Sequence, residues 1–127
     1  MTGMTFAIWG LSFKPGTDDM REAPSLYIVE ELIKRGAHVN VYDPKAMKEA
    51  EKFYLKGMDR VTYFNDKYDV LYNSEALILL TEWKEFRSPD FEIIKSALKF
   101  PVILDGRNQY LAYNLKEKNI EYIRVGK

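Results

Sequence analysis

The sequence predicts an α/β fold: a doubly wound, mainly parallel sheet of six strands with helices on both faces. Short apolar runs rich in β-forming residues alternate with amphipathic or charged runs from one end of the chain to the other. The run at residues 76–80 is apolar at every position, as expected for a central strand covered on both faces. A length of 127 residues fits one domain, residues 1–127.

The first strand–helix–strand unit is the clearest part of the pattern. Residues 4–9 predict a strand. Pro24 fits the first position of a helix whose apolar stripe lies within residues 26–35 and which ends at Gly36. Residues 37–43 predict a second strand, which Pro44 ends. A strand, a helix and a strand joined by short connections make a right-handed unit with parallel strands.

The remaining elements continue this alternation. Further strands are predicted at residues 61–64, 76–80, 102–105 and 120–125, and further helices at residues 44–57, 66–73, 89–98 and 110–118. The alternation does not specify the order of the strands. We expect a Rossmann-like order, in which the first and fourth strands are neighbours and ligands bind at the carboxyl ends of the strands.

Composition excludes several classes of protein. The 19 basic and 19 acidic residues balance, which argues against a basic nucleic-acid-binding surface. There is no cysteine, so disulfides, thiolate metal sites and cysteine nucleophiles are excluded, and the single histidine, His38, reads as an ordinary strand-end residue. No apolar run reaches membrane-spanning length and no secretory signal precedes the first strand, so we expect a cytoplasmic protein without a membrane segment. The sequence shows no Ser/His/Asp set, no metal-ligand cluster and no nucleophile with a base beside it, so we expect neither catalytic residues nor a metal site.

The long segment after the first strand, residues 10–21, is the main candidate for a ligand-binding loop. It carries two cations, Lys14 and Arg21, which suit a phosphate-bearing ligand. The alternative is a solvated loop in which Asp18 or Asp19 pairs with Arg21. The segment lacks the G-x-G-x-x-G pattern, so the usual dinucleotide fingerprint is absent.

Two further loops are expected at the same edge of the sheet, residues 81–87 and 105–108. Together the three loops supply two or three cations and an aromatic ring, a plausible pocket for a diphosphate and a ring. The residues are Lys14, Arg21, Trp83 and Arg107. Trp83 is more simply explained as a packing aromatic, and Arg107 could form a local ion pair with Asp105.

Three acidic residues at this edge have less specific interpretations. Asp43 ends the second strand, where the ribose-binding acid of a dinucleotide site would lie. Because the glycine fingerprint is missing, turn formation by Asp43 and Pro44 is the favoured interpretation. Glu82 and Glu85 are expected to be solvated. From the residues alone, the prediction stops at an anion-binding α/β domain.

Several long motifs add a resemblance to a known family. They are Gly10-x-x-Phe13-Lys14-Pro15-x-Thr17-Asp18-Asp19-x-Arg21-x-x-Pro24, Val41-Tyr42-Asp43-Pro44, Leu80-Thr81-Glu82-Trp83 and Asp105-Gly106-Arg107-Asn108. In this order they resemble the C-terminal, UDP-binding domain of the UDP-glucose/GDP-mannose dehydrogenase family. The first motif is most similar to the form found in bacterial UDP-glucose 6-dehydrogenases.

The resemblance implies roles for matching residues. Phe13, Lys14 and Arg107 match residues that contact the UDP-sugar substrate, and Arg21 matches an arginine that reaches NAD across the cleft. The family oxidises its substrate in two hydride steps through a thioester on a cysteine, which this sequence lacks. The resemblance therefore implies a UDP-sugar-binding fragment without the NAD-binding and central domains, inactive alone.

The parent enzyme is expected to convert UDP-glucose to UDP-glucuronate with two NAD, as a homodimer or larger assembly with the missing domains on the same chain. Two alternatives stay open. The domain could belong to a UDP-N-acetylmannosamine or GDP-mannose dehydrogenase, or it could be a stand-alone nucleotide-binding, regulatory or interaction module.

Overall fold

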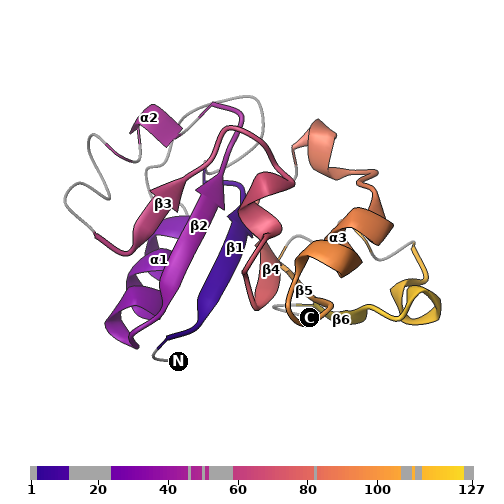
Figure 1. Cartoon of the computed structure of the whole chain (residues 1–127). Coiled ribbons are helices and arrows are strands. Elements are labelled where there is room, and N and C mark those ends of the chain that lie inside the picture. The colour runs from indigo at the N-terminus through magenta and orange to yellow at the C-terminus, as the bar shows by residue number, and fades with distance from the viewer. Residues whose placement is uncertain are drawn as a thin grey trace.

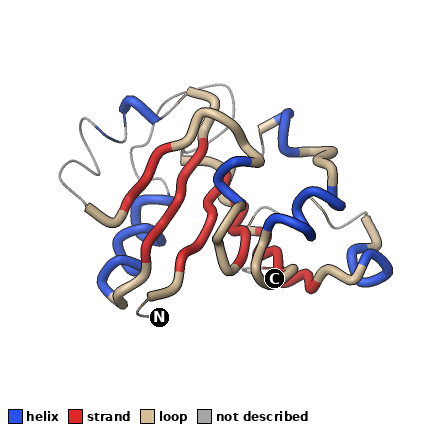
Figure 2. Tube along the Cα trace, viewed as in Figure 1, coloured by secondary structure: helices blue, strands red, loops and turns tan. Residues whose placement is uncertain are grey.

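The computed structural model describes residues 3–11, 24–45, 47–49, 51, 59–81, 83–106, 110 and 113–124. Within these residues, one six-stranded sheet has the order β3-β2-β1-β4-β5-β6, and each pair of neighbouring strands is parallel. Figure 2 shows the strands side by side as a twisted sheet. The predicted α/β class, the number of strands and the neighbouring first and fourth strands are confirmed.

The strands lie where the apolar runs predicted them. They are β1 (Thr5–Trp9), β2 (His38–Tyr42), β3 (Val61–Tyr63), β4 (Ala76–Leu79), β5 (Val102–Asp105) and β6 (Glu121–Arg124). The α-helices are α1 (Pro24–Lys34), α2 (Met47–Glu49) and α3 (Phe91–Ala97), and the 3-10 turns are η2 (Asp69–Leu71), η3 (Lys84–Phe86) and η4 (Leu115–Lys118).

Alternate residues of β1 show how the sheet separates two cores. Phe6 and Ile8 pack with Val29 and Leu32 of α1 on one face, whereas Ala7 and Trp9 join the core that includes α3 on the other. Figure 1 shows α1 behind the sheet and α3 in front of it. Because side chains of a strand alternate between faces, both faces of a central strand must be apolar. Helices on both faces were therefore correctly predicted.

Three predicted helices differ from the structure or lie partly outside it. Of the helix predicted at residues 66–73, only the 3-10 turn η2 forms. Residues 110–118 were predicted to form a helix, but the described part contains only the 3-10 turn η4, preceded by Asn114 with φ −89° and ψ 78°. Asparagine competes for local hydrogen bonds and favours such non-helical positions, so the helix prediction was wrong around Asn114. Of the helix predicted at residues 44–57, the described part includes α2; residues 46, 50 and 52–57 of that helix lie outside the described residues.

Candidate functional site

The carboxyl ends of β1, β4 and β5 lie next to one another, because these strands are parallel neighbours. The chain leaving β1 touches the chain leaving β4: a Cβ atom at Gly10 would lie 2.5 Å from the Cβ of Thr81. The Gly106 amide, just after β5, donates to the Leu79 carbonyl at 2.9 Å. The predicted meeting of the three loops is thus confirmed for the residues at which these loops begin. In an open α/β sheet this edge, where the order reverses beside β1, is the usual ligand crevice.

Asp43 lies at the centre of this edge and is fully buried. Its Oδ2 atom accepts hydrogen bonds from the Leu11 amide at 2.7 Å and from Nε1 of Trp83 at 3.1 Å. Its Oδ1 atom accepts from the Lys45 amide at 2.8 Å, which is the turn contact expected of an Asp-Pro pair. The turn interpretation is borne out, but the carboxylate also joins the loops after β1 and β4.

Asp105 is the second buried carboxylate at this edge, with no exposed surface. Its Oδ2 atom accepts from the Tyr110 amide at 2.8 Å and from the Tyr122 hydroxyl at 2.7 Å. The first bond joins the described residues on either side of Arg107, and the second joins the end of β5 to β6. Burial and the Asp105 hydrogen bond raise the pKa of the Tyr122 hydroxyl, so Tyr122 remains a neutral donor at physiological pH.

A second tyrosine–carboxylate pair joins Tyr42, the last residue of β2, to Glu85 of η3. The Tyr42 hydroxyl donates to Oε1 of Glu85 at 2.9 Å. Burial is the largest cause of the raised pKa of Tyr42, and this hydrogen bond is the next largest. Glu85 is exposed, as predicted, yet it is bonded rather than simply solvated. Trp83 is half-buried and packs against the same core as Trp9, which confirms its predicted packing role. Glu82 lies outside the described residues.

The residues predicted to bind ligand, Phe13, Lys14, Arg21 and Arg107, all lie outside the described residues. The described part contains the residues that flank them. Leu11 is buried at the start of the first loop, and Tyr110 is buried at the end of the segment that carries Arg107. Their assigned contacts with UDP-sugar and NAD therefore stay predictions, and so does an ion pair between Arg107 and Asp105.

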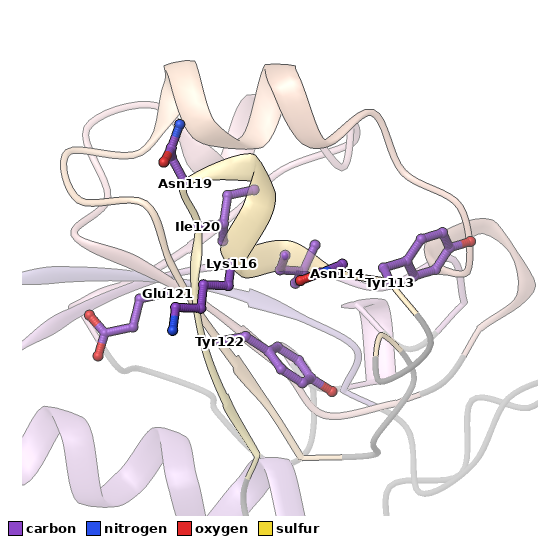
Figure 3. A pocket seen from close by; sticks show the side chains of 8 residues that line it. Tyr113, Asn114, Lys116, Asn119, Ile120, Glu121 and Tyr122 are labelled. Atoms are coloured by element: carbon purple, nitrogen blue, oxygen red, sulfur yellow. The ribbon is translucent and has the colours of Figure 1, made fainter.

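A pocket of about 540 Å³ lies between η4 and β6 (Figure 3). Its lining residues are Tyr113, Asn114, Leu115, Lys116, Asn119, Ile120, Glu121 and Tyr122. Tyr122 connects this pocket to the candidate site, because its hydroxyl donates to Asp105.

The described residues contain no group of three or more side chains that could hold a metal ion, and no helix among them is long and apolar enough to cross a membrane. His38 begins β2, is half-buried and pairs its Nε2 with Oγ1 of Thr62 at 2.8 Å, in line with the strand-end interpretation. The sequence did not reveal that Asp43 and Asp105 hold the loops. The available signal was an acidic residue at the carboxyl end of two apolar runs: Asp43 directly follows β2, and Asp105 is the last residue of β5.

The sheet order and the loops at its carboxyl edge define a Rossmann-like α/β domain of the nucleotide-binding kind. The chain belongs to the UDP-glucose/GDP-mannose dehydrogenase family, because residues 7–112 match the model of that family's UDP binding domain. The resemblance seen in the motifs is therefore confirmed. Phe13, Lys14, Arg21 and Arg107 all fall inside the matched range.

Relatives with curated names agree with this assignment. The chain is 41% identical to UDP-glucose 6-dehydrogenase of Pseudomonas aeruginosa, with 98% of this chain and 28% of that protein covered. It is 38% identical to UDP-glucose 6-dehydrogenase TuaD of Bacillus subtilis, with 98% of this chain and 26% of that protein covered. The chain thus spans about a quarter of the length of the curated relatives it matches.

Solved structures show the same fold. A UDP-glucose dehydrogenase from Pyrobaculum islandicum superposes with a TM-score of 0.75 at 33% identity, covering 97% of this chain and 25% of that chain. An NDP-N-acetyl-D-galactosaminuronic acid dehydrogenase from Methanosarcina mazei superposes with a TM-score of 0.78 at 26% identity, covering 99% and 25%.

Proposed function

We propose that this chain is the UDP-sugar-binding C-terminal domain of an NAD-dependent UDP-glucose 6-dehydrogenase. The observation that carries the proposal is the match of residues 7–112 to the family's UDP binding domain. The two named relatives that share 41% and 38% identity over this domain support glucose as the sugar. The parent enzyme would oxidise UDP-glucose to UDP-glucuronate with two NAD, using a cysteine outside this sequence.

In this proposal the domain binds and orients the substrate rather than performing the chemistry. Lys14 and Arg107 would contact the diphosphate, and Phe13 would contact the substrate beside Lys14. Contacts remote from the reacting sugar carbon can orient it toward the catalytic groups of the other domains. NAD would accept the hydride, and Arg21 is the residue of this chain that we propose to contact NAD.

The wider setting is part of the same proposal. The domain would act beside an NAD-binding domain and a central domain of the same chain, in a cytoplasmic homodimer or larger assembly. The match of the chain to only 28% of its relative's length supports a multidomain parent. We therefore propose residues 1–127 as a single unit of that parent.

Titration of UDP and of UDP-glucose into the 127-residue chain by calorimetry tests the function directly. A charge-assisted contact contributes on the order of 1.5–3 kcal/mol, so Lys14→Ala or Arg107→Ala should each weaken binding roughly tenfold to a hundredfold. Lys34→Ala is the matched control, because Lys34 is an exposed cation in the last turn of α1. Failure of the wild-type chain to bind UDP, or equal effects of all three substitutions, would contradict the proposal.

A solved structure supports UDP-D-ManNAc as a second candidate substrate. A UDP-D-ManNAc dehydrogenase from Pyrococcus horikoshii superposes with a TM-score of 0.73 at 26% identity, covering 97% of this chain and 25% of that chain. Its lower identity makes it the second candidate. Rates of NAD reduction with each sugar nucleotide, measured on an enzyme that contains this domain, distinguish the two.

A further inference from the structure

The buried carboxylate of Asp43 makes more contacts than its turn requires. An Asp-Pro turn needs only the bond from the Lys45 amide to Oδ1, and an exposed aspartate can provide that bond. Here the side chain has no exposed surface, and Oδ2 accepts from Leu11 and Trp83, which lie 32 and 40 residues away in the sequence. Burial of a carboxylate is unfavourable unless its oxygens are well satisfied. The arrangement therefore has a role beyond the turn.

Leu11 is the point at which the first loop leaves the sheet. Its side chain is fully buried, and its amide is held by Asp43. The preceding residue, Gly10, donates its amide to the Tyr42 carbonyl at 2.8 Å and lies against Thr81. The backbone is thus held by β2 on one side and by the β4 loop on the other. In the sequence, the predicted substrate residues Phe13 and Lys14 follow Leu11 by two and three positions.

Trp83 extends the same connection to the loop after β4. Its indole Nε1 shares Oδ2 of Asp43 with the Leu11 amide, and its ring packs against the core that contains Trp9. A shift of Asp43 would therefore move the beginnings of two loops together. Binding groups lose affinity steeply when their anchoring residues are loosened, because preorganisation is lost.

From these contacts we propose that Asp43 is a positioning residue for UDP binding: it touches no ligand, but fixes the exit of the β1 loop through Leu11 and aligns it with the β4 loop through Trp83. This inference rests on the proposed function. It differs from ribose binding by a strand-end acid, because here both carboxylate oxygens accept hydrogen bonds from the protein itself.

The test compares Asp43→Asn with Glu75→Gln in the 127-residue chain, with UDP as the probe. Glu75 is a matched control: it is a buried carboxylate that accepts the Thr5 amide at 2.6 Å, but it lies at the opposite, amino end of the strands. Each substitution replaces an acid by its amide. Asp43→Asn perturbs the bonds from the Leu11 and Lys45 amides and from Trp83, and Glu75→Gln perturbs the bond from the Thr5 amide and the ion pair with Lys99. Amide hydrogen exchange reports the released amide, Leu11 in one variant and Thr5 in the other, while melting temperature reports stability.

We expect Asp43→Asn to speed exchange at Leu11 and to weaken UDP binding roughly tenfold, since a displaced binding group can lose up to about a hundredfold. Glu75→Gln should speed exchange at Thr5 and leave the UDP dissociation constant within about twofold of wild type. Unchanged affinity in Asp43→Asn, or equal weakening in Glu75→Gln, overturns the inference. Absence of UDP binding by the wild-type chain overturns the proposed function and this inference with it.

If Asp43→Asn does not fold, Trp83→Phe takes its place. This substitution keeps Asp43 and the aromatic ring but removes the indole donor. We expect UDP binding about threefold weaker in a folded protein, because one of the two long-range bonds to Oδ2 is lost. Unchanged affinity in Trp83→Phe would then overturn the inference.

Discussion

Gly10 and Thr81 are in direct backbone contact where β1 and β4 end: a Cβ atom at residue 10 would lie 2.5 Å from the Thr81 Cβ and 2.6 Å from the Thr81 backbone nitrogen. Gly10 also has a φ of +99°, a conformation that other residues rarely adopt. Gly10→Ala should therefore lower the free energy of unfolding by about 2–4 kcal/mol, as backbone strain adds to steric overlap. Urea denaturation measures the change.

Gly3→Ala is the control that separates these two causes. Gly3 has a similar φ of +84°, but no atom of the described residues lies within 4 Å of its hypothetical Cβ. Its substitution should cost only about 1 kcal/mol, the part due to backbone strain. Equal losses for the two variants would show that contact with Thr81 does not constrain the sheet edge.

The fold could be predicted from the sequence because each helix and strand is identified by a pattern within a short stretch of the chain. The apolar run of β1 and the amphipathic stripe of α1 each identify an element, and their alternation restricts the topology to a parallel sheet. The neighbouring β1 and β4 follow from general rules for such sheets and need no knowledge of side-chain contacts.

The anchors of the candidate site could not be predicted in the same way. The bonds of Asp43 to Leu11 and Trp83 join residues far apart in the sequence, and periodicity carries no information about them. Tyr110 was expected to begin a helix, but its amide bonds to Asp105 and its hydroxyl to the Phe86 carbonyl. The bond to Phe86 spans 24 residues and holds the Tyr110 side chain in the core, and no local pattern in the sequence indicates it.

Tyr110 is expected to make the protein sensitive to alkaline pH. Tyr110 is fully buried, and its hydroxyl donates to the Phe86 carbonyl at 2.6 Å. Burial is the largest cause of its raised pKa, and the charge of Asp105 is the next largest. Above pH about 10, the unfolded chain loses this proton while the native protein keeps it. Stability is therefore fully present below that pH and falls above it, by about 1.4 kcal/mol per pH unit for this group.

Tyr110→Phe should make that alkaline slope shallower by about 1.4 kcal/mol per pH unit, while costing about 1 kcal/mol at neutral pH for the lost hydrogen bond. Tyr27→Phe is the control, because Tyr27 is 67% exposed. Denaturant melts between pH 7 and 11 measure both slopes. An unchanged slope in Tyr110→Phe would exclude Tyr110 as the group responsible.

The chain by itself is expected to have no dehydrogenase activity. It contains no cysteine, and the proposed reaction requires a cysteine thioester. Absorbance of NADH at saturating UDP-glucose and NAD should stay at the blank rate, with the UDP-glucose 6-dehydrogenase of Pseudomonas aeruginosa as the positive control. Turnover above the blank by pure protein would contradict the proposed division of roles between this domain and the others.

The two cations of the loop after β1 are expected to serve different ligands. In an enzyme that contains this domain, Arg21→Ala should raise the KM for NAD roughly tenfold and leave the KM for UDP-glucose within about threefold, because Arg21 is proposed to contact the cofactor. Lys14→Ala should do the reverse. Steady-state kinetics with each substrate varied in turn measure both ratios.

The competing explanation for Arg21 is a structural ion pair with Asp18 or Asp19. That pairing predicts a lower melting temperature for the Arg21→Ala form of the 127-residue chain, with both KM values changed alike in the enzyme. The cofactor role instead predicts an unchanged melting temperature and a change confined to NAD, since an arginine that contacts only a ligand stabilises the bound state alone. A larger effect on the KM for UDP-glucose than for NAD would reject the cofactor role of Arg21 outright.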